Sequence, residues 1–333
     1  MCNGTIMDKL ISFSIPLMLS GILQLMFNAV DIVVVGRFSG SQALAAVGST
    51  TALINVFTNL FIGISLGANV LAARYYAAGK TKEMSETVHT AIALALVSGV
   101  AMAVIGVVFA RGALEIMGTP DDVIAKSTLY MRIYFCGMPF FMMYNYGAAI
   151  LRAVGDTKRP LIFLIVSGVI NAVLNLFLVI GFHLDVAGVG IATVISQLVS
   201  CILVLRCLHH TESSYQLHLA KLRIRSVYLK QIFEVGVPAG IQSTVINISN
   251  AMLQSSVNSF GSIAMAGYTA SNNIFGFLYV SVNSFTQACM SFTSQNYGVK
   301  KLKRMDRVLI DCMILSVVVT LILGSSVYIF GQE

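Results

Sequence analysis

The chain contains the same membrane pattern twice, once from Pro16 and again from Pro238. These two prolines are 222 residues apart; one residue then drops out in a loop, and Tyr76 aligns with Tyr297 at an offset of 221. Both copies consist of long apolar stretches separated by short polar connections. A repeat of this kind is typical of secondary transporters, in which the solute path lies between the two copies.

The composition places these stretches in a lipid bilayer. Hydrophobic residues make up 57% of the 333 residues and charged residues only 11%, whereas soluble domains carry about 25% charged residues. Roughly twenty apolar residues in a helix cross the hydrocarbon core, so the sequence predicts an all-α polytopic membrane protein. We expect nine spans, at residues 10–35, 45–73, 87–110, 124–150, 161–181, 187–208, 232–258, 263–292 and 306–330.

The basic residues are distributed unequally between the two sides of the predicted membrane. Seventeen of the 21 Lys and Arg fall in alternate connections between the spans. The other connections hold Arg37, Arg111, Lys126 and Arg132. Because cytoplasmic loops carry the excess of Lys and Arg, the N-terminus is predicted to lie in the cytoplasm. The net charge of +7 thus indicates membrane topology rather than binding to nucleic acid.

The repeat also predicts the domain organisation. Because the first copy has an even number of spans, both copies have the same orientation, related by an axis along the membrane normal. We expect an N-terminal six-helix lobe at residues 1–208 (the N-lobe), a cytoplasmic linker at 209–231 and a partial C-terminal lobe of three helices at 232–333 (the C-lobe). The linker could form an amphipathic surface helix. If the copies were once equal, a complete protein would be about one hundred residues longer, so we expect the chain to be a fragment or a shortened product.

One carboxylate is predicted to lie inside the membrane. Asp31 follows an uncharged run of the first span and precedes four further apolar residues. An acid in the hydrocarbon region costs roughly 2.5–3.5 kcal/mol on insertion scales, so such residues face a cavity or the bundle interior and are functional candidates. The alternative is an acid near the outer interface, because Arg37 is only six residues away. Gln24 and Asn28 share the helix face of Asp31 at spacings of four and three.

Polar residues at helical spacing also mark the fifth and sixth spans. Asn171 and Asn175 are one turn apart in the fifth span, and Thr193 and Gln197 are one turn apart in the sixth. Oxygen atoms from Asp31, Asn171, Asn175 and Thr193 would suit Na⁺, or a carboxyl group that binds and releases H⁺. The alternative for each polar residue alone is a hydrogen bond that joins two helices. We predict that the set forms a coupling site, with Gln24, Asn28 and Gln197 as a supporting polar face.

The second copy has a polar face without an acid. The repeat partner of Asp31 is Leu253. A neutral polar face suits the lining of a path for a bulky solute, although interhelical hydrogen bonding is an equal alternative for each residue. The predicted path residues are Asn247, Asn250, Gln254, Asn283 and Gln287.

Pro16 lies about four turns before Asp31 on the predicted first helix and removes one backbone hydrogen bond there. A kink at this proline could couple protonation to bending, or it could be static. No catalytic motif is present, and the five His and six Cys are not spaced as metal ligands or disulfides. We therefore expect no enzyme activity and no cofactor, only a coupling ion, H⁺ or Na⁺.

The chain resembles the bacterial branch of the multidrug and toxic compound extrusion (MATE) transporters. The resemblance extends over the whole chain and is carried by IPLMLSGILQLMFNAVDIVVVGRFSGSQALAAVG at 15–48, LRAVGDTKRP at 151–160, NAVLNLFLVIG at 171–181, AGVGIATVISQ at 187–197 and SQNYG at 294–298. It implies two six-helix lobes around a central cavity in the bacterial cell membrane. It also implies export of small amphipathic, often cationic compounds in exchange for Na⁺ or H⁺.

The same resemblance lends roles to individual positions. Asp31 is similar to the acid on the first helix of the family, and Pro16 to the proline at which that helix bends. Asn171 and Thr193 match cation-site positions. Asn175 stands where many relatives have Asp, a departure that removes one carboxylate.

Three functions follow as hypotheses. The first is an antiporter that exports drugs by alternating access of its two lobes. The second is a lipid-linked oligosaccharide flippase of the same superfamily, which would need basic residues in its cavity. The third is a truncated membrane protein that does not transport. None of these requires a nucleic acid partner; the bilayer and a small organic solute are the expected partners.

Overall fold

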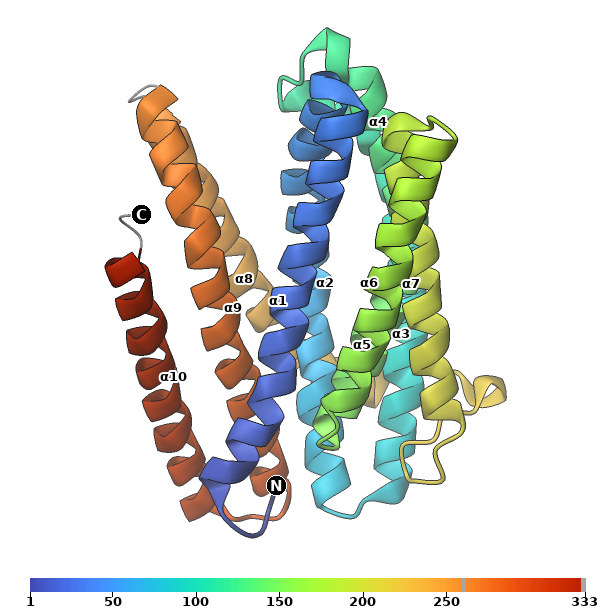
Figure 1. Ribbon diagram of the computed structural model, residues 1–333. Helices are drawn as coiled ribbons and strands as arrows, with labels where there is room; N and C mark the ends of the chain where they lie inside the picture. Colours follow the sequence, from blue (N-terminus) through green and yellow to red (C-terminus); the bar gives the residue numbers. More distant parts are fainter. Residues whose placement is uncertain (259–261, 331–333) are drawn as a thin grey trace.

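The computed structural model describes residues 1–258 and 262–330, and within them the chain is helical throughout, with no strand (Figure 1). Short turns join most of the helices. The elements are α1 (Ile6–Phe38), α2 (Gly40–Ala77), α3 (Thr81–Ile116), α4 (Asp121–Cys136), α5 (Met138–Ala153), α6 (Lys158–Leu176), the π-helix η1 (Phe177–Gly181), α7 (Asp185–His209), the 3₁₀ helix η2 (Leu219–Lys221), α8 (Ser226–Asn258), α9 (Ser262–Gly298) and α10 (Leu302–Phe330).

Each of the nine predicted stretches falls on helical structure. By length and composition, six helices of the described residues are able to cross a membrane: α1, α2, α3, α6 with η1, α7 and α10. The helices α8 and α9 are long, with 33 and 37 residues, but their polar faces make them less apolar. The chain is a multi-pass membrane protein.

The predicted span 124–150 is not one continuous helix. It is divided between α4 and α5, which meet at Gly137. Pro139 sits in the first turn of α5. Because proline has no N–H and its ring clashes with the preceding turn, it favours the start of a helix over its interior. The break turns the end of α4 toward α7, where Gln197 lies against Gly137.

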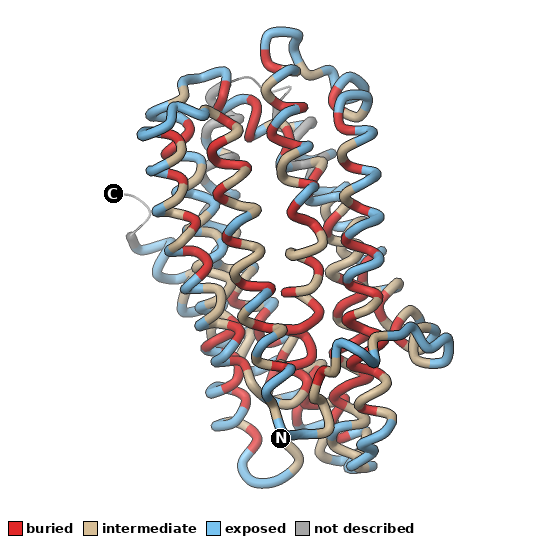
Figure 2. The backbone as a smooth tube through the Cα atoms, turned by 90° about the vertical axis from the view of Figure 1, so that its right-hand side faces the viewer, coloured by how far each residue is buried: buried red, intermediate tan, exposed pale blue. Residues whose placement is uncertain are grey.

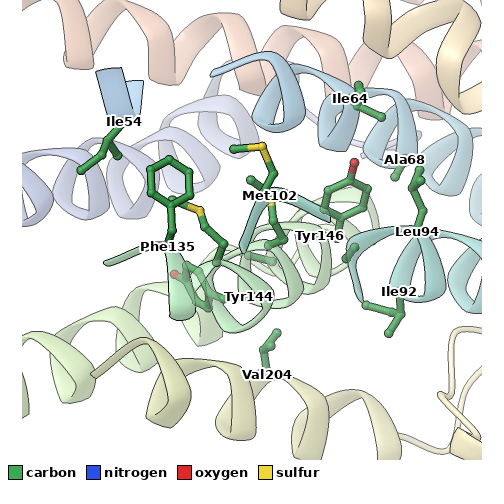
Figure 3. Close-up of a cluster of buried hydrophobic side chains, with 14 of the residues drawn as sticks. Ile54, Ile64, Ala68, Ile92, Leu94, Met102, Phe135, Tyr144, Tyr146 and Val204 are labelled. Atoms are coloured by element: carbon green, nitrogen blue, oxygen red, sulfur yellow. The ribbon is translucent and has the colours of Figure 1, made fainter. Parts of the chain in front are cut away.

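The core of the N-lobe lies between α2, α3, α4, α5 and α7. Figure 3 shows Phe135, Tyr144 and Tyr146 among aliphatic side chains from the surrounding helices. Phe57 meets the ring of Phe135 edge to face, at 6.1 Å between centroids. Buried and exposed positions alternate along each helix, so that one face meets the neighbouring helices and the other faces outward (Figure 2).

Helices of the predicted N-lobe and C-lobe pack against each other. The first helix of each repeat packs against the second helix of the other, so α8 crosses α2 and α1 contacts α9. Gly63 and Gly67 of α2 face Gly236 and Gly240 of α8, and a Cβ atom at Gly63 would collide with the backbone of Gly240. Two small-xxx-small pairs that face each other allow the backbones of membrane helices to approach closely.

The helix α1 is divided between the lobes. Its first half packs into a cluster with α9 and α10, where Phe13 meets Phe292 edge to face at 5.5 Å. Its second half leaves the C-lobe and packs on α6, with the ring of Phe27 over Gly168. Pro16 lies inside the helix in its first half, where Ser20 Oγ donates to the Pro16 carbonyl at 2.7 Å. In Figure 1, α8 and α9 diverge from α1 toward the end of the molecule opposite the N-terminus.

The predicted linker does not form an amphipathic helix of its own: it contains the three-residue η2, and its last residues from Ser226 belong to α8. Its polar groups are bound by the start of α3 instead. Arg223 and Arg225 pair with Glu86 at 2.6 and 3.2 Å, and the His218 N–H donates to His89 Nε2 at 3.1 Å. Contacts to α3 thus satisfy groups that an amphipathic helix would leave in solvent.

Candidate functional site

Asp31 lies on the second half of α1, half-buried and turned toward α6. Asn175 Nδ2, on the last turn of α6, donates a hydrogen bond to Asp31 Oδ1. The contact joins positions 144 residues apart in the chain. The structure thus brings the acid and the asparagine face of the fifth predicted span together.

A chain of hydrogen bonds extends from this contact into the N-lobe. Asn175 Nδ2 also donates to Asn171 Oδ1 at 3.2 Å, and Asn171 Nδ2 approaches Thr193 Oγ1 at 3.5 Å. Thr193 Oγ1 in turn donates to the Val189 carbonyl at 2.9 Å. Asn171 and Asn175 are 6% and 0% exposed, so the chain of amides is shielded from solvent. All four residues predicted to form a coupling site belong to this one network.

Two tyrosines that the sequence analysis did not select stand beside Asp31. Tyr130 and Tyr134 of α4 lie close enough to interact with its charge, and their rings are 6.1 Å apart. Tyr134 also lies next to Gln197 of α7. Their spacing of four places them on one helix face, a signal that could have found them, but tyrosines at that spacing are more often ordinary core residues.

Two amide oxygens near the acid are buried without a hydrogen-bond partner in the described part of the chain, Asn175 Oδ1 and Gln197 Oε1. Unpaired buried acceptors are rare in folded proteins and each needs an explanation. Both oxygens are acceptors without a donor among the described residues of the surrounding helices.

The other two members of the predicted α1 face do not join the network. Gln24 and Asn28 are exposed, and neither side chain makes a hydrogen bond to the described residues. Both side chains lie on exposed positions of α1, whereas the ring of Phe27 between them packs on Gly168 of α6. Residues on one helix face share a site only where a neighbouring helix runs alongside that face.

A π-helix follows Asn175 directly. Residues Phe177–Gly181 form η1, and the chain then turns through His183 and Asp185, both with positive φ. Lys126 of α4 pairs with Asp185 at 2.7 Å and closes this end of the lobe. Single π-helical turns inside helices are frequent at functional sites because they re-aim the neighbouring side chains.

The predicted path residues of the C-lobe are found in different settings. Asn250 and Asn283 are exposed, and Asn247 is half-buried and donates to the Ser243 carbonyl at 2.8 Å. The side chain of Gln254 lies outside the described residues. Gln287 accepts a hydrogen bond from Arg152 Nη1 at 3.0 Å.

A second polar network joins the lobes further along α9, beyond Asn283. Asn69 of α2 donates to the Ala149 carbonyl at 2.8 Å and accepts from Ser291 Oγ of α9 at 3.1 Å. One turn further, Gln295 Nε2 donates to the Ala153 carbonyl at 2.6 Å. This contact ties the ends of α2, α5 and α9 together.

The described residues hold no group of three or more His, Cys, Asp or Glu that could bind a metal ion. A hard cation at Asp31 would therefore depend on amide and hydroxyl oxygens. Asn171 Oδ1 and Thr193 Oγ1 already accept hydrogen bonds, which leaves Asn175 Oδ1 as the free amide oxygen of this set.

Long repeated membrane helices, with a carboxylate hydrogen-bonded between two of them, are an arrangement typical of transporters. The MatE family model matches residues 16–177 and 238–333. The chain therefore belongs to the MATE family, whose members are transporters rather than enzymes.

The comparisons with individual proteins agree with this assignment. The chain is 31% identical over 328 residues to the probable multidrug resistance protein YoeA of Bacillus subtilis, covering 96% of this chain and 71% of that protein. It is 21% identical to the multidrug export protein MepA of Staphylococcus haemolyticus, covering 98% and 73%. Its fold matches a structure described as the outward-facing conformation of a multidrug resistance MATE family transporter, with a TM-score of 0.92 at 21% identity, over 99% of this chain and 73% of that one.

Proposed function

We propose that the chain exports amphipathic organic compounds in exchange for H⁺, with Asp31 as the group that binds the proton. The hydrogen bond between Asn175 and Asp31 is the observation that carries the proposal, because it places a titratable group inside a lobe. Two similar proteins are named for multidrug resistance and multidrug export, which supports drugs as the substrate class.

The geometry around Asn175 favours a proton over Na⁺. As an N–H donor to Asp31, Asn175 suits an ionised carboxylate. When Asp31 is protonated, the Asn175 amide can rotate so that its unpartnered Oδ1 accepts the new O–H. Na⁺ would require several oxygens turned inward at once, and two of the four candidates are already used by their neighbours.

The division of α1 between the lobes supplies the coupling. Protonation neutralises Asp31 and lowers the free energy needed to bury it against α6. The second half of α1 can then move on α6 while the first half stays in its cluster with α9 and α10. Pro16, which interrupts the backbone hydrogen bonds of α1, is the place where the two halves can bend relative to each other.

The distribution of charge supports the orientation. The basic connections lie at the end of the molecule that holds the N-terminus, so this end is cytoplasmic by the positive-inside rule. The end at which α8 and α9 diverge from α1 then faces outward (Figure 1). Asp31, beyond the middle of α1, is nearer to this outer end and takes up its proton from outside.

The test is transport by the full chain in proteoliposomes loaded with a cationic dye. A pH gradient should drive dye flux against its concentration, and a Na⁺ gradient at equal pH should not. Flux under the Na⁺ gradient alone would show that the coupling ion is wrong. If a well-folded protein gives no flux under either gradient, the non-transporting alternative replaces the antiporter.

A further inference from the structure

Arg152 lies against a small cavity between α2, α5 and α9. The pocket is lined by Leu66 and Asn69 of α2, Arg152 of α5, and Gln287, Met290 and Ser291 of α9. The side chain of Arg152 is half-buried at the last turn of α5. In the sequence Arg152 lies three residues before the GDTKRP turn, and it counts among the basic residues of the predicted cytoplasmic connections.

The charge of Arg152 is not balanced by an acid. The ion pairs of the described residues use Lys80, Arg111, Lys126, Arg159, Arg223 and Arg225, and none includes Arg152. Removing a guanidinium from water without a counter-ion is expensive, so a buried cation normally has an anionic partner. Arg152 has only the neutral amide oxygen of Gln287.

Most donors of Arg152 remain available. A guanidinium has five N–H groups, and one nitrogen, Nη1, is hydrogen-bonded to the protein. The other nitrogens are not among the fully enclosed polar atoms that lack a partner. The side chain is partly exposed, so these nitrogens are available as donors.

The walls of the pocket hold Arg152 in place without neutralising it. The amide of Asn69 is engaged on both sides, as donor to Ala149 and as acceptor from Ser291. Leu66 and Met290 complete the lining with apolar surface. A cation next to apolar side chains fits a ligand that is itself amphipathic, with an acidic group at one end.

The pocket lies where the polar face of α9 passes from exposed to buried. Asn283 is exposed, Gln287 is half-buried, and Ser291 and Gln295 are 2% and 4% exposed. These four residues follow one another at a spacing of four and so share one helix face. Arg152 and Gln287 therefore lie at the point where this face passes from exposed to buried.

We propose that Arg152 and Gln287 form a subsite for the carboxylate of the exported compound. The inference rests on the proposed export function and narrows its substrate class to amphipathic compounds that carry an acidic group, including zwitterions. A planar guanidinium can hold a carboxylate through two parallel hydrogen bonds. Because Arg152 belongs to the N-lobe and Gln287 to the C-lobe, a bound solute touches both.

The test compares two dyes that differ only in this group, tetramethylrhodamine, which has a free carboxylate, and its methyl ester. Binding to the full chain in nanodiscs of phosphatidylcholine is followed by fluorescence anisotropy. The carboxylate form should bind about tenfold more tightly, a preference of ordinary size for one charged contact. Arg152→Gln should remove the preference and leave binding of the ester unchanged, and Arg152→Lys should retain part of it.

The matched control is Arg132→Gln, which removes an exposed arginine of α4 and should preserve the preference. Equal losses for both dyes in Arg152→Gln would assign Arg152 to holding the lobes together and overturn the proposal. No preference in the unmodified chain would also overturn it. If phosphatidylglycerol in the nanodisc displaces the carboxylate dye, the occupant is a lipid phosphate, and the assignment to the solute is wrong.

The two proposals fail separately. Binding in nanodiscs needs no ion gradient, so a chain that binds the carboxylate dye but shows no gradient-driven flux contradicts antiport and leaves the subsite standing. Gradient-driven flux together with an unchanged dye preference in Arg152→Gln contradicts the subsite alone.

Discussion

The equivalent helices α1 and α8 differ in how they are held. The helix α8 is fixed on α2 by four glycines, which bring the two backbones into contact. At the corresponding positions α1 has Ser14 and Met18 and α9 has Ser284 and Ala288. The four-glycine contact is therefore absent between α1 and α9, and the second half of α1 packs on α6 instead.

The same two helices differ in charge. Asp31 of α1 is hydrogen-bonded to Asn175, whereas its counterpart Leu253 of α8 is 56% exposed. The repeat thus gives one helix that is tightly fixed and neutral, and one that is divided between lobes and carries the carboxylate. The proposed antiport mechanism requires this difference, because the charged helix has to move relative to a fixed one.

The largest expected effect is on stability, from disrupting the glycine contact between α2 and α8. Gly240→Leu places a side chain against the backbone of Leu60. Overpacking typically costs about 1–3 kcal/mol, and a clash with rigid backbone should lie at or above the upper end. We expect loss of monodisperse protein, measured by size-exclusion chromatography, and a lower melting temperature. Gly48→Ala on α2, where an added Cβ meets nothing within 4 Å, is the control and should fold normally.

The next largest effect is on efflux, from removing the charge of Asp31 on α1. Asp31→Asn should reduce gradient-driven efflux roughly a hundredfold, at the upper end of coupling free energies of about 1–3 kcal/mol. Folding should persist, because the amide is less expensive to bury than the carboxylate. Dye flux in proteoliposomes measures the first expectation and thermal unfolding the second. Asp311→Asn, which removes a half-buried acid of α10, should transport normally; equal losses in both variants would exclude a special role for Asp31.

A smaller effect tests the choice of ion. Asn175→Asp places a second carboxylate next to the first, and two adjacent carboxylates resist joint ionisation unless a cation lies between them. Efflux should become Na⁺-stimulated, by about fivefold, within the usual range of coupling effects. The measurement is flux against Na⁺ concentration at fixed pH. If Na⁺ has no effect on this variant, the surrounding oxygens cannot turn toward the site.

The smallest effect compares the two prolines. Pro16→Ala restores an N–H that can bond to the Ser12 carbonyl and should straighten α1, with efflux reduced about threefold, near the lower end of coupling effects. Pro238→Ala makes the same change in α8, which the glycines already fix, and should leave efflux unchanged. The measurement is the dye flux of the two variants, reconstituted in equal amounts. Equal losses of efflux in both variants would exclude a functional bend at Pro16.

The sequence by itself determined the repeat, the helical membrane segments and the candidate ion site. Apolar length and the spacing of Asn171 and Asn175 are local properties, because bilayer and helix geometry impose them on each segment separately. For the same reason the sequence singled out Asp31 as an isolated acid within an apolar run.

Only the tertiary structure decided which of these faces meet. Gln24 and Asn28 share the predicted face of Asp31, but both are exposed and neither joins its hydrogen-bond network. The tyrosines beside Asp31, the break at Gly137 and the contact of Arg152 with Gln287 likewise depend on which helices cross and at what height. Helical periodicity gives the direction of a side chain relative to its own axis, whereas the partner it reaches is fixed by packing between helices that are far apart in the chain.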